Sequence, residues 1–526
     1  MENNEIINFC VEKGLLLDNE LLTSFIELED ISSIKIIIEK IKSYTNKKFL
    51  TKDLFFKNKD KLNSFIVSLP KNDQEKLEKI RVKLGLTIEI SKEEPLEEVQ
   101  VVSRSVKVNE MPPCLNKKLE VKDFVNYFRG RYDEMKNYLQ ENSELENLVS
   151  INKISNNKQN FSVIGLISDK QMTKNKNIIL EIEDLSGKMK VLINQKNEEL
   201  YKKAEDITLD SVLGFKGNGN KEIIFVSEIF FPDIFVSEKK KSPIEEYCVF
   251  IGDLHYGSKL FLKNSFEKFI KYLNGEIPDT PEVEKLKYLF LVGDVVTGVG
   301  NYPDQEKDLV ISDLEEQFSG LATLLKKIRK DITIVISPGN HDGVRIMEPQ
   351  PLLDEKYAWQ LYEMENVVLT GNPAEVNIGS TNGFTGFNVL TYHGFSFTYY
   401  ANNIPKLMIE KTMNSPEKIM KYLLMNRHLA PTHASVQYFP SPKDNLIIRT
   451  LPDIFVSGHT HKSAITSYNN ILVISVSSWE GITPYQEKFG NKPDHCKVPL
   501  FNLKTRGVKI LDFLDESERE MCGGED

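Results

Sequence analysis

The 526-residue sequence is poor in cysteine and tryptophan, with five residues of the first type and two of the second. The cysteines, Cys10, Cys114, Cys248, Cys496 and Cys522, are scattered, and no two of them form a C-x-x-C pair. This spacing argues against a disulfide framework and against a zinc site built from thiolates. It favours free thiols in a reducing compartment.

Long apolar runs are also missing. No segment approaches the ~18 consecutive apolar residues that a membrane-spanning helix needs. The first ten residues, MENNEIINFC, lack the basic and apolar regions of a secretion signal. We therefore expect a cytoplasmic protein without a membrane partner, and its length predicts two to four domains.

The net charge of −10 is concentrated at the two ends of the chain. Residues 1–30 carry a net charge of −7 and residues 512–526 a net charge of −6, which leaves residues 31–511 at +3. An acidic protein repels DNA, but the central part of this chain has no acidic excess. Overall charge therefore neither favours nor excludes a nucleic-acid substrate.

The pattern of apolar residues predicts an α+β or α/β multidomain fold with four regions. Residues 1–90 are predicted to form a helical domain, because apolar side chains recur at helical spacing in SSIKIIIEKIKSY, KLNSFIVSLP and DQEKLEKIRVKLGL. Residues 91–118 combine charge and prolines without periodicity, which predicts a flexible linker.

Residues 119–240 are predicted to hold a helix followed by a small barrel. The helix, over residues 122–139, carries a stripe that we expect to pack against a neighbouring domain: Phe124, Tyr127, Phe128, Tyr132, Met135 and Leu139. Four or five short β-rich segments follow between residues 161 and 231, with one helix-like insert, KNEELYKKAED. This arrangement resembles an OB-fold, which binds nucleic acids in many proteins and joins proteins in others. No aromatic platform with interleaved arginines decides between the two uses.

Residues 241–526 contain the residues that indicate chemistry. Five apolar segments each end at side chains that can bind a metal, in CVFIGDLH, YLFLVGD, ITIVISPGNHD, FNVLTYH and DIFVSGHTH. Ligand sites in α/β sheets gather where strands end, because the loops there converge while the sheet holds them rigid. The candidate ligands are Asp253, His255, Asp294, Asn340, His393, His459 and His461.

This ligand set indicates the kind of metal. Oxygen and imidazole donors without a thiolate suit manganese, iron or zinc better than magnesium or calcium. Seven ligands are enough for two ions that share one carboxylate, and such a pair can clamp the attacking and leaving oxygens of a phosphoryl transfer. A lone histidine is usually a core or surface residue, as we expect of His428, His433 and His495. The other five histidines all lie in strand-end motifs, which chance does not explain.

The ordered series D-x-H, GD, GNHD, a histidine after a strand, and GHTH is similar to that of the calcineurin-like metallophosphoesterases, a superfamily that includes exonucleases. The resemblance implies a β-sandwich flanked by helices. It implies that one ion is held by Asp253, His255, Asp294 and His461, and the other by Asp294, Asn340, His393 and His459. His341 matches the histidine that does not bind metal; held by Asp342, it would protonate the leaving oxygen.

A narrower resemblance connects the chain to the small subunits of archaeal family D DNA polymerases. It rests on FVNYFRGRYDEM, GDVVTGVGNYPDQE, SPGNHDGVRIMEPQP and SSWEGITPYQEKFGNKP, and on the order of the parts. It implies a 3′→5′ exonuclease that proofreads DNA and acts on single-stranded DNA or on the 3′ end of a primer. Manganese is the expected metal, with iron or zinc as alternatives. The implied partner is a large catalytic polymerase subunit, in a heterodimer or larger assembly. A sliding clamp is a further candidate.

One residue departs from the superfamily pattern. Thr297 stands where GDxxDG usually carries a second aspartate, and we expect this change to tune loop contacts rather than to abolish activity. Two functions of other classes remain as alternatives. One is a stand-alone phosphatase or cyclic phosphodiesterase that acts on a small molecule or a phosphoprotein. The other is a scaffold subunit with a silent site.

Overall fold

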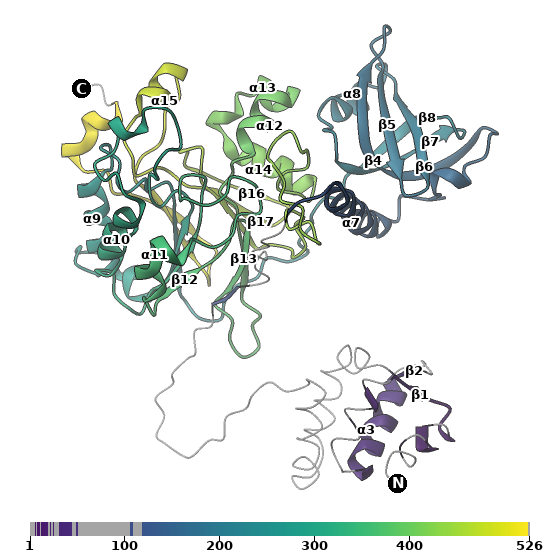
Figure 1. Ribbon diagram of the computed structural model, residues 1–526, viewed down its shortest axis with the longest axis horizontal. Helices are drawn as coiled ribbons and strands as arrows, with labels where there is room; N and C mark the ends of the chain where they lie inside the picture. The colour runs from purple at the N-terminus through teal and green to yellow at the C-terminus, as the bar shows by residue number, and fades with distance from the viewer. Residues whose placement is uncertain are drawn as a thin grey trace. The chain divides into compact units, whose positions relative to one another are not determined.

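The chain divides into two compact units, Met1–Val101 and Val102–Asp526, which are drawn in Figure 1. The computed structural model describes residues 6, 8–10, 12–18, 21–22, 25, 31–44, 49–50, 106–108 and 118–523. Among these residues, no helix has both the length and the apolar character that crossing a lipid bilayer requires.

The first unit contains one long helix among its described residues. This helix, α3 (Ile31–Tyr44), covers the first of the three predicted helical segments. The other two segments lie outside the described residues. The sequence did not predict the short parallel strands β1 (Leu16–Leu17) and β2 (Phe49–Leu50), which pair with each other.

The predicted aromatic helix is α7 (Val121–Gln140), and its stripe packs as expected. Asp123 accepts the backbone N–H of Glu120, which closes the first turn of the helix. Further along, Tyr132 and Leu139 join a cluster with Ile164 of the barrel. Earlier in the helix, Tyr127 is buried in a different cluster, which belongs to the C-terminal part of the chain. The helix therefore joins two structures.

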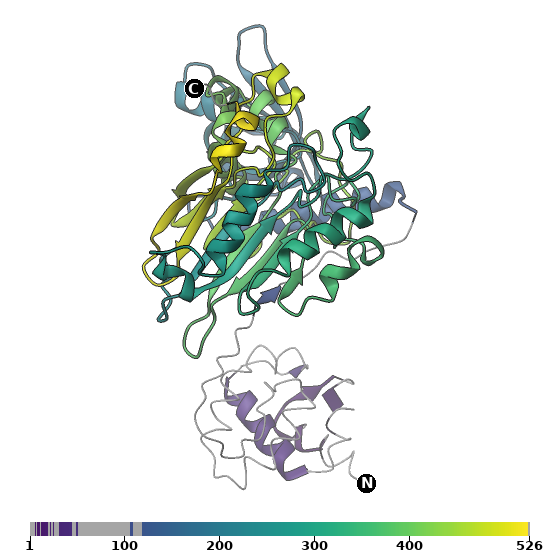
Figure 2. The same cartoon turned by 90° about the vertical axis from the view of Figure 1, so that its left-hand side faces the viewer.

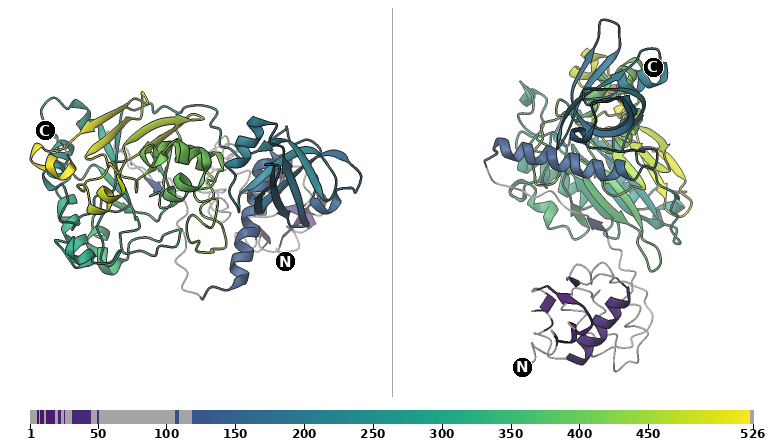
Figure 3. Two further views of the ribbon diagram at one scale, coloured as in Figure 1. Left: turned by 90° about the horizontal axis from the view of Figure 1, so that it is seen from above. Right: turned by 90° about the vertical axis from the view of Figure 1, so that its right-hand side faces the viewer.

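A closed barrel follows α7, and the right-hand view in Figure 3 shows it end-on with α7 running beside it. Its strand order is β4-β5-β6-β8-β7, and the helix α8 (Glu198–Glu205) lies between the third and fourth strands in sequence. Alternating apolar side chains point inward, and the interior is filled by residues such as Val163, Leu180, Val191 and Phe215. The strands are β4 (Gln159–Met172), β5 (Ile178–Asp184), β6 (Gly187–Ile193), β7 (Val212–Gly219) and β8 (Ile223–Phe230).

Two six-stranded sheets pack face to face in the C-terminal part. The first sheet has the order β12-β11-β10-β9-β18-β19, and the second has the order β16-β17-β15-β14-β13-β3. Apolar side chains from both sheets, including Phe250, Phe290, Val389 and Val456, form one cluster between them. The strands of the first sheet are β9 (Tyr247–Ile251), β10 (Leu286–Val292), β11 (Thr333–Ser337), β12 (Val367–Leu369), β18 (Lys497–Asn502) and β19 (Val508–Asp512). Those of the second sheet are β3 (Lys107–Val108), β13 (Ala374–Ile378), β14 (Phe387–Thr391), β15 (Ile454–Ser457), β16 (Ala464–Tyr468) and β17 (Ile471–Ser475).

Helices cover the outer faces of both sheets, as Figures 1 and 2 show. Phe266, Leu321 and Leu361 come from three different helices and pack on the first sheet in one cluster. On the second sheet, Tyr400 and Leu423 pack against Phe455. The result is the predicted sandwich flanked by helices. The helices are α9 (Lys263–Leu273), α10 (Leu314–Leu325) and α11 (Glu355–Tyr362) on one side, and α12 (Phe397–Asn403), α13 (Pro405–Ile409) and α14 (Pro416–Met425) on the other.

Part of the predicted flexible linker belongs to this sandwich. β3 pairs antiparallel with β13, with Val108 opposite Val376 and Lys107 opposite Asn377. At these residues the linker prediction is therefore wrong, because the backbone completes a sheet edge. Residues 91–105 and 109–117 of the predicted linker lie outside the described part of the chain.

Candidate metal centre

The predicted ligands converge at one edge of the sandwich, where five strands end. β9, β10 and β11 run parallel in the first sheet, so the residues after them emerge at the same edge. β14 and β15 run parallel in the second sheet and deliver His393 and the GHTH loop. The loops leave the strands abruptly, and five of the seven ligands have the positive φ angles that side chains rarely adopt: Asp253, His255, Asp294, His459 and His461. Strained backbone of this kind is a mark of functional sites.

Two glycines allow the loops to approach one another this closely. A Cβ atom on Gly293 would lie 2.2 Å from Nδ1 of His393, and one on Gly339 would lie 2.2 Å from Oδ1 of Asp294. No side chain fits at either position. The glycines of the GD and GNHD motifs are therefore required by the packing of the ligands themselves.

The first group of ligands is formed by Asp253, His255 and His461. Their ligand atoms all lie within 4.8 Å of one another, and all three residues are buried. The Nε2 atoms of His255 and His461 face each other at 3.1 Å. The Nε2 atom of His461 lies 3.7 Å from Oδ1 of Asp253. Two imidazole nitrogens directed at one point beside a carboxylate form a suitable site for a cation.

The second group is formed by Asp294, His393 and His459, with the same 4.8 Å limit between their ligand atoms. The Nε2 atom of His393 lies 3.1 Å from Oδ2 of Asp294 and 3.1 Å from Oδ1 of Asn340. Its Nδ1 atom lies 3.1 Å from the carbonyl of Val292. Because a carbonyl only accepts hydrogen bonds, Nδ1 carries the proton there, and Nε2 is directed at the other ligands.

Charge and burial prepare these side chains for divalent ions. Burial, together with the neighbouring His341, lowers the pKa of His255 to about 3. Burial and His393 lower that of His459 to about 3. Both imidazoles are therefore neutral at pH 7, which is the form that binds a metal. Burial opposes ionisation of Asp294, but the adjacent imidazoles outweigh it and hold its pKa well below the usual range. Although burial opposes it, Asp294 in turn raises the pKa of His393 to about 10, so that imidazole would give up a proton when a metal binds, whereas the neutral His255 and His459 would not need to.

His341 lies beside both groups, but its environment differs from the prediction. Its backbone N–H donates to Oδ1 of Asp294 at 2.8 Å, and its Nδ1 atom lies 2.9 Å from the carbonyl of Thr297. Asp342 does not hold it. The two carboxylate oxygens of Asp342 accept the backbone N–H groups of Val296 and Gly339, at 2.9 and 2.7 Å. Asp342 therefore ties two ligand loops together, and the main chain at position 297 orients the histidine.

The site opens into a cavity of about 710 Å³, within the size range of small-ligand sites. Some of the residues that line it had no predicted role. Glu480 is buried, and its Oε2 atom lies 4.0 Å from Nε2 of His255. The side-chain amide of Gln486 lies 3.0 Å from Nδ1 of His461. Both belong to the segment SSWEGITPYQEKFGNKP, which the sequence analysis used only as evidence of family resemblance. The one feature that could have pointed to these two residues is that the segment follows the GHTH loop closely in the sequence.

The three histidines that were expected to be structural lie outside the groups of ligands. His428 is buried and lies 2.9 Å from Oδ2 of Asp444. His433 stacks on the ring of Tyr438, and His495 is buried. The cysteines within the described residues, Cys10, Cys248, Cys496 and Cys522, are free.

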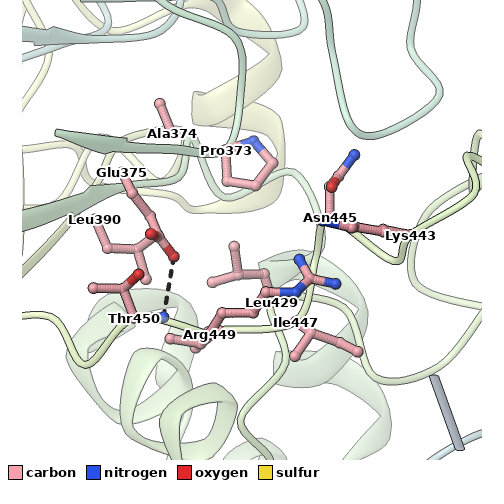
Figure 4. A pocket seen from close by; sticks show the side chains of 11 residues that line it. Pro373, Ala374, Glu375, Leu390, Leu429, Lys443, Asn445, Ile447, Arg449 and Thr450 are labelled. Atoms are coloured by element: carbon pink, nitrogen blue, oxygen red, sulfur yellow. Dashed lines mark hydrogen bonds between the residues drawn. The ribbon is translucent and has the colours of Figure 1, made fainter. Parts of the chain in front are cut away.

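A second cavity, of about 380 Å³, lies at the start of β13, and Figure 4 shows its lining. Glu375 accepts the backbone N–H of Thr450 there at 3.4 Å, and Arg449 is paired with Glu134 of α7. None of the metal-ligating groups found among the described residues borders this cavity. The chemistry therefore belongs to the larger cavity.

Comparisons with known proteins give two further findings. Residues 248–463 match the calcineurin-like phosphoesterase family. The chain is similar to two proteins named DNA polymerase II small subunit. The alignment with the protein of Pyrococcus furiosus spans 403 residues at 36% identity, and it covers 75% of this chain and 64% of that protein. The alignment with the protein of Methanothermobacter thermautotrophicus spans 399 residues at 36% identity, and it covers 75% of this chain and 80% of that protein. The chain thus spans slightly less than two thirds of the Pyrococcus protein. Among solved structures, an archaeal phosphodiesterase aligns with 50% of this chain and 98% of its own at 12% identity, with a TM-score of 0.26.

Proposed function

Because the chain belongs to the family of DNA polymerase II small subunits, we propose that it is a two-metal 3′→5′ exonuclease that proofreads DNA ends. Its partner would be a separate large subunit that synthesises DNA, in a heterodimer or larger assembly. A sliding clamp is a second candidate partner. The family match and the phosphoesterase match support the hydrolase class, and the DNA substrate is part of the proposal.

One observation carries this proposal: Asp294 lies between the two groups of ligands, with its Oδ2 atom 3.1 Å from His393 and 3.9 Å from His255, and it lines a cavity. We assign Asp253, His255, Asp294 and His461 to one ion and Asp294, Asn340, His393 and His459 to the other. Manganese is the expected metal, with iron or zinc as alternatives, since the donors are mixed oxygen and nitrogen. Divalent ions at these positions would supply the positive charge that stabilises the phosphoryl oxygens during cleavage.

The protein's own side chains would position the substrate and move its proton. His341 lines the cavity, and its Nδ1–H is held by the carbonyl of Thr297. Nε2 is therefore the atom that can carry a second proton and pass it to the departing 3′ oxygen. Asp342 would support this step indirectly, by fixing the loops that hold Asp294 and His341.

The domain organisation fits the same function. We assign the barrel and α7, residues 119–240, to an OB-fold domain that contacts DNA or the large subunit. Residues 241–526 form the exonuclease domain, and residues 1–90 form an N-terminal domain that contacts another replication protein or the large subunit. Replication takes place in the cytoplasm of archaeal cells, and we propose that location for this chain.

A single experiment separates this function from its alternatives. The purified full chain is incubated with manganese and end-labelled DNA, either single-stranded or with a mismatched 3′ end, and the product ladder is read. A proofreading exonuclease shortens both substrates one nucleotide at a time from the 3′ end. A stand-alone phosphatase would leave them intact but hydrolyse p-nitrophenyl phosphate rapidly. A silent scaffold would hydrolyse neither and still bind the large subunit.

A further inference from the structure

The loop after β10 places an exposed aromatic ring in the same cavity as the metal ligands. Tyr302 lines this cavity together with His341 and His461, and 43% of its surface remains exposed. Base–aromatic stacking is a general way for proteins to hold single-stranded nucleic acid without reading its sequence. A ring in this position can serve that purpose only if its orientation is fixed.

The loop that carries Tyr302 is fixed from below by two buried glutamines. Gln305 accepts the backbone N–H of Asn301 at 2.8 Å and donates to the carbonyl of Thr297 at 3.0 Å. Gln317 accepts the backbone N–H of Gly298 at 2.9 Å. The hydroxyl of Tyr302 itself donates to Oδ2 of Asp308 at 2.9 Å. The ring is therefore held in place before any ligand arrives, which reduces the entropy lost on binding.

The position of the loop indicates which nucleotide the ring would meet. The side-chain amide of Asn301, next to Tyr302, lies 3.2 Å from Nδ1 of His341. His341 is the proposed donor to the departing oxygen, so Tyr302 belongs to the leaving-group side of the site. Two basic residues, Lys462 and Lys492, come from other loops that line the cavity, where they can hold backbone phosphates.

We propose that Tyr302 is a stacking platform for the nucleobase on the leaving-group side of the scissile phosphate. At a DNA 3′ end, this is the penultimate base. The proposal rests on the proposed exonuclease function and names how its substrate is seated. Stacking accepts all four bases, as a proofreading enzyme requires. Stacking on Tyr302 also requires a single-stranded 3′ end, because the ring must take the place of a base that would otherwise stack on the penultimate base.

Abasic substrates test this proposal with the full chain and manganese. Three end-labelled single-stranded oligonucleotides are compared: one intact, one abasic at the penultimate nucleotide and one abasic at the terminal nucleotide. Tyr302→Ala should raise KM about tenfold for the intact and the terminal-abasic substrates, because it removes the ring on which the penultimate base stacks. It should leave KM for the penultimate-abasic substrate unchanged. Tyr302→Phe, which keeps the ring, should stay within about threefold of the wild type.

A matched control and a binding measurement complete the test. Tyr362 is 40% exposed and also hydrogen-bonded through its hydroxyl, but it lies outside the cavity. Tyr362→Ala should therefore behave like the wild type. Binding is followed separately, with calcium in place of manganese, through the fluorescence of 2-aminopurine at the penultimate position. The wild type should change this fluorescence, and Tyr302→Ala should not.

Each outcome decides between the two proposals. The stacking proposal is overturned if Tyr302→Ala raises KM equally for intact and penultimate-abasic DNA. It is also overturned if the increase in KM disappears with the terminal-abasic substrate instead. Base-dependent binding without any product keeps the platform and refutes the exonuclease. Hydrolysis that is insensitive to Tyr302→Ala keeps the exonuclease and refutes the platform. A wild-type chain that neither binds nor cleaves these oligonucleotides refutes both.

Discussion

The Nδ1 atom of His341 lies 2.9 Å from the backbone carbonyl of Thr297. The contact uses the main chain, so it does not depend on which side chain stands at position 297. This explains how the site can orient its histidine although the aspartate of the superfamily pattern is replaced by threonine. Thr297 is buried, and the loop around it is held by Gln305.

The first prediction separates the proton donor from the metal ligands. His341→Ala should keep both ions and lower kcat by roughly 10²–10⁴, the usual contribution of a general acid. Thr297→Ala keeps the carbonyl and should stay within about threefold of the wild-type rate. Elemental analysis and single-turnover kinetics on labelled DNA provide the measurements. Loss of metal from His341→Ala as large as that from His393→Ala would contradict the assigned role.

The second prediction concerns the shared ligand. Asp294 belongs to the second group and also lies within ligand distance of His255 from the first, since its Oδ2 atom is 3.1 Å from Nε2 of His393 and 3.9 Å from Nε2 of His255. Asp294→Asn removes one negative charge from the point where both ions bind, so bound metal and nuclease activity should both be lost. Asp304→Asn, on the exposed loop, is a matched control that should keep both. Half or more of the wild-type activity in saturating manganese would refute the ligand assignment.

These two predictions use residues that the sequence identified, and the reason is physical. Each ligand lies within four residues of the end of an apolar strand, so its sequence neighbours already indicate that it lies at a sheet end. Glu480 and Tyr302 could not be found in this way, because long loops bring them to the site. The Thr297 carbonyl was also invisible, since every residue has one. β3 escaped prediction because two residues are too short to show a period.

The third prediction concerns a buried acid that binds no proposed metal. Burial raises the pKa of Glu348 to about 8 from 4.5, and its carboxylate accepts the hydroxyl of Tyr392 at 2.9 Å. The folded state therefore favours the protonated form. The stability that this gives is complete below pH 4.5 and is lost as the pH rises to about 8.

Glu348→Gln removes this dependence, because its amide stays neutral and its oxygen can still accept from Tyr392. At pH 8 the variant should be more stable than the wild type by about 2 kcal/mol or more, and at pH 4.5 the difference should vanish or reverse. Thermal unfolding in EDTA at several pH values measures the effect. Glu375→Gln, in the second cavity, should follow the wild-type curve. Parallel curves for wild type and Glu348→Gln would show that Glu348 ionises normally.

The last prediction depends on how α7 is attached to the phosphoesterase part. The Nε atom of Arg131 donates to Oδ2 of Asp444 at 2.6 Å, and the Tyr127 hydroxyl donates to Oδ1 of the same residue at 2.6 Å. Arg131 and Asp444 are both fully buried. Removing one member of a buried ion pair leaves an uncompensated charge and costs ~3–5 kcal/mol.

Three truncated chains should therefore differ in a defined order. A chain that begins at residue 102 keeps β3 and α7, so its melting temperature and exonuclease rate should match those of the second unit in the full protein. A chain that begins at residue 119 loses the strand beside β13, and it should melt a few degrees lower while staying active within several-fold. A chain that begins at residue 146 also loses α7, which removes the cation paired with Asp444 and uncovers the apolar clusters that Tyr127 and Tyr132 help to fill. It should be insoluble or melt far below the other two.

Since an insoluble fragment carries little information, Arg131→Ala in the full chain provides the decisive comparison. It should lower the melting temperature of the second unit without removing any bound metal, and a melting temperature equal to that of the wild type would show that the Arg131–Asp444 pair does not stabilise the attachment of α7.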